Sequence, residues 1–141
     1  DIGCGKGFLL YELKKQVPGV IIRGLDISSY AIKNAKEEVK EYLKIGDANK
    51  LPYSDKEFDL VLSINTLHNL YCFDLFSALQ EIERVGKEKK YLCVESYRNE
   101  TEKVNLLYWQ VTCEAFFNTE EWKWIFNQNN YGGDYSFIFF E

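Results

Sequence analysis

Short apolar runs alternate with amphipathic, helix-like segments along most of this 141-residue chain. Residues 20–26, 58–64 and 91–95 read as buried strands, and segments with apolar residues at three- and four-residue spacing separate them. Such alternation builds a mostly parallel sheet, because right-handed crossover connections leave few other topologies. We therefore predict an α/β fold with a doubly wound, mostly parallel, Rossmann-like sheet and helices on both faces.

Two helical segments in the second half of the chain carry different apolar patterns. The first should bury one side against the sheet, through Leu75, Leu79, Ile82 and Val85. The second has one apolar stripe at Val104, Leu107, Tyr108, Val111 and Ala115, and further apolar residues on another side at Leu106, Trp109 and Cys113. A helix of that kind is either sandwiched in a core or partly covers a ligand.

Composition excludes several classes of function. Seventeen Lys and Arg against 22 Asp and Glu give a net charge of -5, so the chain lacks the basic footprint that drives nucleic-acid binding. Four scattered cysteines and one histidine indicate neither a metal site nor a disulfide framework, and a reducing cytoplasm fits best. No apolar run is long enough to span a membrane, so we expect no membrane partner.

The chain opens on a glycine turn, D-I-G-C-G-K-G, without the apolar strand that should lead into it. We therefore expect residues 1–141 to form a single, partial domain whose first strand is absent from this chain. Within it, residues 97–118 break the alternation, and we expect them to form a helical insertion or lid beside the ligand site.

Ligands bind an open parallel sheet beyond the carboxyl ends of its strands, where the strand order reverses. The glycine turn should lie there and let a ligand approach the main chain. Asp26 ends the next strand, where a carboxylate can accept hydrogen bonds from both ribose hydroxyls, and Asp47 ends the third strand. With Asp1, these carboxylates describe a cradle for a nucleoside.

A dinucleotide site is the competing interpretation. It needs the pattern G-x-G-x-x-G, and the third glycine would fall at position 8, which is Phe8. A carboxylate at Asp1 would also be unfavourable beside a pyrophosphate, whereas it suits a ligand that carries an ammonium or sulfonium group.

These motifs, in their order and spacing, resemble those of class I S-adenosylmethionine-dependent methyltransferases. The resemblance covers about residues 1 to 96 and rests on the glycine turn, on L-D-I-S, on the stretch from Gly46 to Val61 and on I-N-T-L-H-N-L. It implies methyl transfer from S-adenosylmethionine, with S-adenosylhomocysteine as product. The chain departs from the family after residue 126, where it offers one plausible strand instead of a final hairpin.

The resemblance also implies roles for individual residues. Asp1 and the glycine-turn backbone would hold the methionine part of the cofactor, and Asn65 would lie beside that part through its main chain. The turn residues concerned are Gly3, Cys4, Gly5 and Gly7.

The nucleoside part would contact two further strand ends. Asp26 would take the ribose hydroxyls while Ile27 lies against the adenine, and Asp47 with the backbone of Ala48 would read the adenine edge.

The acceptor side is less defined. His68, the only histidine, follows the fourth strand of the family pattern and is the candidate general base. Tyr97, Arg98 and Trp109 are candidate substrate contacts, with Arg98 suited to an anionic group. No Pro-Pro-Tyr or Pro-Cys follows the fourth strand, as in enzymes that methylate DNA bases, and the paired-glutamate loop of protein arginine methyltransferases is missing. We therefore expect a small-molecule acceptor with an oxygen or nitrogen nucleophile. The alternatives are a catalytically silent cofactor-binding regulatory module and, more weakly, an NAD-dependent oxidoreductase.

Overall fold

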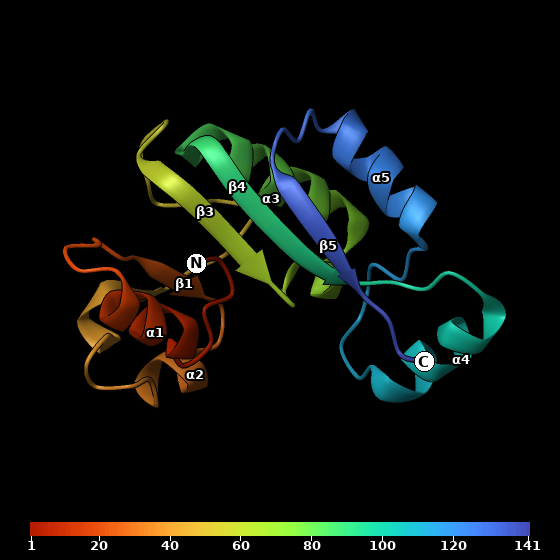
Figure 1. Ribbon diagram of the computed structural model, residues 1–141, viewed down its shortest axis with the longest axis horizontal. Coiled ribbons are helices and arrows are strands. Elements are labelled where there is room, and N and C mark those ends of the chain that lie inside the picture. The colour runs from red at the N-terminus through yellow and green to blue at the C-terminus, as the bar shows by residue number, and fades with distance from the viewer.

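The computed structural model describes residues 1–141 and follows the predicted alternation of helices and strands (Figure 1). The α-helices are α1 Phe8–Gln16, α2 Ser29–Lys33, α3 Cys72–Val85, α4 Glu100–Trp109 and α5 Thr119–Gln128. The strands are β1 Gly24–Asp26, β2 Leu43–Ile45, β3 Phe58–Ile64, β4 Gly86–Glu95 and β5 Asp134–Ile138. Two 3₁₀ turns, η1 Lys40–Tyr42 and η2 Leu67–Asn69, complete the order.

All strand pairs are parallel, which confirms the predicted α/β class. β1 pairs with β2, and β4 lies between β3 and β5. Figure 1 shows α3 behind β4 and β5 and α1 in front of β1, and α5 lies beside β5, where it shares the core of α3. Parallel strands place their carboxyl ends at one edge, so the loops that follow β1, β2, β3 and β4 share that edge.

Residues Asp1 to Gly3 connect the two groups of strands. On one side the Leu25 N–H donates to the Asp1 carbonyl at 3.0 Å, and the Gly3 N–H donates to the Leu25 carbonyl at 2.8 Å. On the other side the Ile2 N–H donates to the Leu62 carbonyl at 2.8 Å, and the Ser63 hydroxyl donates to the Ile2 carbonyl at 3.0 Å. Asp1–Gly3 therefore occupies a strand position between β1 and β3.

The main core lies between β3, β4 and the two helices behind them. The four predicted inner residues of α3, Leu75, Leu79, Ile82 and Val85, are all buried, which confirms that pattern. α5 adds Trp122, Ile125 and Phe126 to the same core. No helix of the chain combines the length and hydropathy needed to cross a bilayer.

Two strand predictions are corrected. The predicted strand 20–26 shortens to β1 Gly24–Asp26, because residues 20–23 have no neighbouring strand to pair with. β3 has the predicted bounds but is not buried on both faces: Leu60 is 47% exposed. Its edge facing β1 pairs only through Ile2, and Leu60 lines the open space beside that edge.

α4 also differs from the predicted apolar helix. It ends at Trp109, and its expected stripe is exposed apart from Ala115, with Tyr108 at 88% and Val111, beyond the helix, at 95%. The residues that α4 buries are Leu106 and Glu102. Figure 1 shows the reason: α4 stands clear of the sheet beyond the carboxyl ends of β4 and β5, so no second layer packs on it.

Candidate cofactor and acceptor site

The glycine turn lies at the carboxyl edge of the sheet, and its glycines differ in what surrounds them. Gly3, Gly5 and Gly7 all have positive φ, at 78°, 53° and 76°. A side chain at Gly3 would overlap Thr66, and one at Gly7 would lie 2.8 Å from Val39 Cγ2. Gly5 has no atom within 4 Å of that position, so the turn is open to a ligand at Gly5 alone.

Asp26 holds the turn in place. Its Oδ2 accepts the Gly5 N–H at 2.8 Å, and its Oδ1 accepts the Ser28 N–H at 2.8 Å. Each carboxylate oxygen has a second lone pair, so the group can still accept two hydroxyl hydrogen bonds. Ile27 follows with its side chain 71% exposed, which offers an apolar surface for a flat ring beside the carboxylate.

Asp47 and Ala48 lie next to this strand end, because the Gly46 N–H donates to the Asp26 carbonyl at 3.0 Å. Asp47 Oδ1 accepts the Asn49 N–H at 3.1 Å. Ala48 is buried in the core, so only its backbone can serve a ligand.

Asn65 is the last of the candidate cofactor residues on this edge of the sheet. It adopts a left-handed backbone at φ 56°, and its N–H donates to the Cys93 carbonyl at 2.9 Å. The next residue, Thr66, packs on Gly3, so the loop after β3 touches the glycine turn. Sequence reasoning missed Thr66, and no local pattern points to it.

The Cys4 side chain has little access to solvent. It is buried between the turn and the strands, and burial, followed by the charge of Asp26, raises the pKa of its thiol to about 11. The thiol is therefore protonated at neutral pH, and the contribution of Cys4 to a site is its backbone.

His68 is 2% exposed and forms a buried pair with Glu95, the last residue of β4. Its Nδ1 accepts the Glu95 N–H at 3.3 Å, and its Nε2 lies 3.6 Å from Glu95 Oε2. Burial lowers the pKa of the imidazole to about 4 and raises the pKa of the Glu95 carboxyl. Since Nδ1 accepts a hydrogen bond, the neutral ring carries its proton on Nε2.

Glu95 is the site-edge residue that sequence reasoning missed. Its Oε2 is buried without a hydrogen-bond partner. Burying a carboxyl oxygen in this way costs stability, and such groups are often found at functional sites. The signal was available: Glu95 is the one charged residue at the end of the apolar run 91–94.

The segment after α4 is tied to His68. The His68 carbonyl accepts N–H groups from Glu114 at 3.0 Å and Ala115 at 2.9 Å, and the Thr112 hydroxyl donates to Asn69 Oδ1 at 2.7 Å. Residues 112–115 are thus hydrogen-bonded to η2, in the loop that follows β3.

In this structure the side chains of the three candidate substrate residues contact other residues of the chain. Arg98 is paired with Glu102 and, at 2.7 Å, with Glu141. The Tyr97 ring stacks on Phe116 with centroids 5.2 Å apart. Trp109 is 66% exposed and packs on Phe140, so these three side chains do not converge with His68.

No group of three or more His, Cys, Asp and Glu side chains lies close enough to hold a metal ion. All four cysteines are free thiols.

Comparison with known proteins decides the family. The sequence pattern of the family described as "Methyltransferase domain" matches residues 1–130. The chain belongs to the class I S-adenosylmethionine-dependent methyltransferases. A methyltransferase of this kind from Archaeoglobus fulgidus superposes with a TM-score of 0.71 and 27% identity over 92% of this chain and 58% of that one.

Curated relatives show the same relationship over part of their length. A demethylmenaquinone methyltransferase of Lactiplantibacillus plantarum is 38% identical over 106 residues, which is 68% of this chain and 44% of that protein. The mitochondrial arginine-hydroxylase NDUFAF5 of Mus musculus is 38% identical over 88 residues, 62% of this chain and 25% of that protein. The chain thus spans less than half of the length of these relatives.

A further structural neighbour was solved with a protein partner. It is a methyltransferase in complex with the Trm112 activator of Haloferax volcanii, with a TM-score of 0.70 and 25% identity over 92% of this chain and 58% of that one.

S-adenosylmethionine is the cofactor that this family implies, and the residues at the edge fit it. The open position at Gly5 admits a ligand against the backbone, the fixed Asp26 carboxylate suits vicinal hydroxyls, and exposed Ile27 suits an adenine face.

Proposed function

We propose that this chain forms the cofactor-binding part of an enzyme that transfers a methyl group from S-adenosylmethionine to oxygen or nitrogen of a small molecule. The observation that carries the proposal is the bond between the Gly5 N–H and Asp26 Oδ2. It sets the Asp26 carboxylate, which we propose as the ribose ligand, beside the one open glycine of the turn.

The residues at this edge of the sheet would each contact one part of the cofactor. Asp1 and the backbone of Gly3, Cys4 and Gly5, with Gly7 starting α1, would hold its methionine part, next to the main chain of Asn65. Asp26 and Ile27 would hold the ribose and adenine, and Asp47 and the Ala48 backbone the adenine edge. When bound, the cofactor supplies a methyl group on a positively charged sulfur. Positioning can supply much of the remaining catalysis.

On the acceptor side we propose His68 as the residue that accepts a proton. Its neutral state at pH 7 is required of a base. Residues 97–118 would act as a lid, bringing Tyr97, Arg98 and Trp109 to the acceptor when the hydrogen bonds of residues 112–115 to η2 open. The chain's net charge of -5 supports a small molecule over a nucleic acid.

A cofactor-binding regulatory module is the second candidate. The observation in its favour is that His68 is 2% exposed and both of its ring nitrogens face Glu95. No other histidine is present to serve as a base.

Turnover separates the two candidates. Production of S-adenosylhomocysteine is followed with a panel of phenols, catechols and primary amines, for the wild type and for His68→Gln. Acceptor-dependent turnover that falls at least tenfold in His68→Gln supports the enzyme. Cofactor binding without turnover on any member of the panel supports the silent module.

We also propose a cytoplasmic location, which four free thiols favour. The mouse relative carries the word mitochondrial in its name, so the experiment is imaging of the tagged protein in its native cell. Co-localisation with mitochondria would contradict the proposal.

A further inference from the structure

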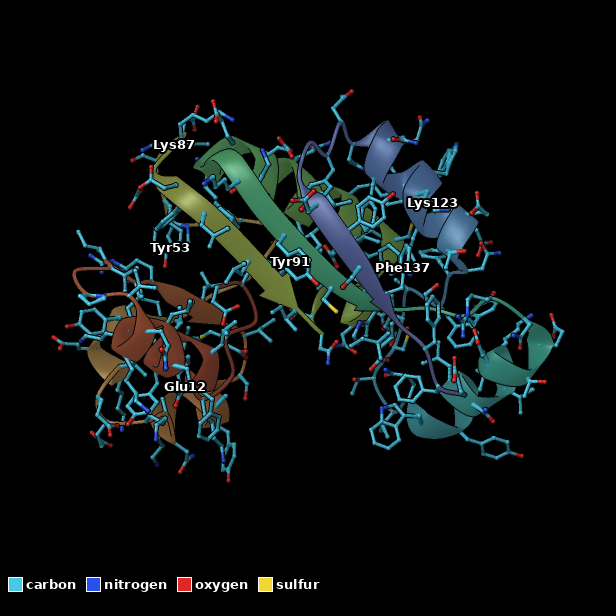
Figure 2. The ribbon with its side chains drawn as sticks, viewed as in Figure 1. Glu12, Tyr53, Lys87, Tyr91, Lys123 and Phe137 are labelled. Atoms are coloured by element: carbon cyan, nitrogen blue, oxygen red, sulfur yellow. The ribbon has the colours of Figure 1, made fainter.

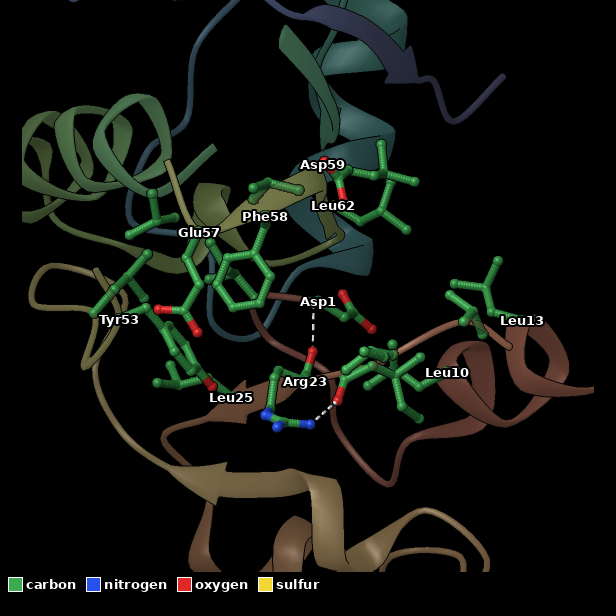
Figure 3. Close-up of a pocket in the computed structure, with 18 of the residues that line it drawn as sticks. Asp1, Leu10, Leu13, Arg23, Leu25, Tyr53, Glu57, Phe58, Asp59 and Leu62 are labelled. Atoms are coloured by element: carbon green, nitrogen blue, oxygen red, sulfur yellow. Dashed lines mark hydrogen bonds between the residues drawn. The ribbon is translucent and has the colours of Figure 1, made fainter. Parts of the chain in front are cut away.

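Two cavities of the chain differ in what lines them. One, of about 490 Å³, lies behind Asp1 among residues of α1, β1 and β3 (Figure 3). The other, of about 510 Å³, lies where α3 and α5 begin. Its lining includes Cys72, the first residue of α3, and its remaining residues belong to α5 or directly precede it. We call it the α3–α5 cavity.

The part of the α3–α5 cavity nearest the core is apolar and fixed. Ile125 is 3% exposed and belongs to the main core. Phe117 packs edge-on against Trp122 with ring centroids 5.6 Å apart, and its carbonyl accepts the Ser96 hydroxyl at 3.1 Å. Core contacts therefore hold Ile125 and Phe117 in the positions that a ligand would meet.

Exposed aromatic side chains surround the opening. Trp124 lines the α3–α5 cavity and is 57% exposed. On either side of Cys72, Tyr71 and Phe73 are exposed and stack with ring centroids 5.8 Å apart. The faces of such rings attract both flat apolar groups and organic cations.

The charge of the lining is negative. It includes the carboxylates of Glu120 and Glu121 and no Lys, Arg or His. These two residues lie one helical turn before Trp124, so the carboxylates and the indole share a face of α5.

Each carboxylate has one oxygen free for a ligand. Glu121 Oε2 accepts the Asn118 N–H at 2.7 Å, and Glu120 Oε1 pairs with Lys123 at 2.7 Å, whereas Glu121 Oε1 and Glu120 Oε2 have no partner. Lys123 lies on the same helix (Figure 2) but does not line the cavity. Its ion pair with Glu120 is exposed, so water screens it and it holds Glu120 only weakly.

We propose that the α3–α5 cavity binds a small organic cation, in which a short chain joins an ammonium group to an aromatic ring. The ring would lie on Ile125 and Phe117 beside the Trp124 indole, and the ammonium group would face Glu120 and Glu121. Both an aromatic face and a carboxylate attract a cation. The volume of about 510 Å³ falls within the range of small-molecule sites, roughly 300 to 1,000 Å³.

The lining disfavours two other occupants. An anion would meet two carboxylates and no cation of the lining. An extended peptide binds by pairing its backbone with a strand edge, and helices form the walls here.

This inference goes beyond the proposed methyl transfer and does not depend on it. None of the lining residues is a candidate contact of the cofactor or of the methyl acceptor. Binding is therefore measured without S-adenosylmethionine.

The experiment uses three probes that share a phenyl ring and a short chain but differ in charge: phenethylamine, phenethyl alcohol and hydrocinnamate. Each is titrated into the chain at pH 7, and NMR follows the indole N–H of Trp124, identified by its loss in Trp124→Phe. The indoles of Trp109, packed on Phe140, and of Trp122, bonded to the Glu95 carbonyl, are internal references.

Variants separate the charge from the apolar surface. The double variant Glu120→Gln, Glu121→Gln removes both charges, and a glutamine at position 121 can still complete the capping box of α5. Trp124→Ala removes the indole, and its binding is followed at the Ile125 N–H. Glu88→Gln, at an exposed position of β4, is the matched control.

We expect a Kd for phenethylamine of roughly 0.1 to 10 mM. Its affinity should exceed that of phenethyl alcohol at least fivefold and that of hydrocinnamate at least tenfold. The double variant should bind phenethylamine at least fivefold more weakly and phenethyl alcohol equally well, and Trp124→Ala should weaken both. Glu88→Gln should match the wild type.

Two results would overturn the proposal. A Trp124 signal that no probe shifts more than those of Trp109 and Trp122 would show that the cavity is not a binding site. Equal affinity for all three probes, or for phenethylamine in the wild type and the double variant, would show that it does not select a cation.

Discussion

Acidification should destabilise this chain through one residue, His68. Its imidazole is 2% exposed, and burial lowers its pKa from 6.5 to about 4. In the unfolded chain the same ring returns to its ordinary pKa and takes up a proton more readily. The charged form is therefore favoured by unfolding.

The sign and size follow from proton linkage. A folded pKa below the unfolded value gives stability that is complete above pH 6.5 and lost as the pH falls through about 4. A difference of about 2.5 units corresponds to about 3 kcal/mol. Glu95 opposes this trend, because burial raises the pKa of its carboxyl and the folded state gains a proton there on acidification.

The segment whose N–H groups donate to the His68 carbonyl also carries Cys113 and Glu114. Burial and the nearby Glu95 raise the pKa of the Cys113 thiol to about 11, so it stays neutral throughout this range. A comparison with His68→Gln removes the imidazole and leaves these carboxyl groups in place.

Two measurements check the prediction. Urea unfolding of the wild type and of His68→Gln at pH 7 and pH 4 should show a loss of stability about 3 kcal/mol larger in the wild type. The NMR signal of the only histidine should titrate near pH 4. Titration near pH 6.5, or an equal pH dependence in both chains, would refute the burial of His68 as described.

Four further substitutions test the packing of the fold and the glycine turn. Gly3→Ala should lower the free energy of unfolding by about 3 kcal/mol in a urea titration, because its methyl group overlaps Thr66 at a positive φ. Gly5→Ala meets no atom, so calorimetry should show a loss of about 1 kcal/mol in stability and a larger loss of cofactor affinity. Leu79→Ala should cost 2 to 5 kcal/mol, roughly the range for buried leucines, whereas Tyr108→Ala should change thermal unfolding by less than about 0.5 kcal/mol. Stable Gly3→Ala or Leu79→Ala chains would contradict the fold.

The parts of the fold that could be predicted are those decided by local pattern. The inner residues of α3, the bounds of β3 and the N-cap at Ser28, whose hydroxyl accepts the Ala31 N–H at 3.1 Å, all follow from spacing and residue type. The row of cofactor residues at strand ends could be predicted for the same reason, since parallel strands end at one edge. Their roles stay predictions.

The predictions that were wrong depend on which other segments pack against a given one, and the spacing of apolar residues carries no information about that. Residues 20–23 have strand-like composition but no neighbouring strand, so β1 is short. Val104 and Tyr108 are exposed because no element covers α4. The His68–Glu95 pair joins residues 27 positions apart, and neither residue's neighbours in sequence indicate the contact.

The most direct test of the central claim is calorimetric titration of this chain with S-adenosylhomocysteine, using NAD⁺ as the control ligand and Asp26→Ala as the control variant. We predict a Kd of roughly 1 to 100 μM, about -8 to -5 kcal/mol, with affinity at least tenfold lower in Asp26→Ala and no binding of NAD⁺. Absence of binding to the folded chain, or equal affinity in Asp26→Ala, would contradict the assignment of this edge as the cofactor site.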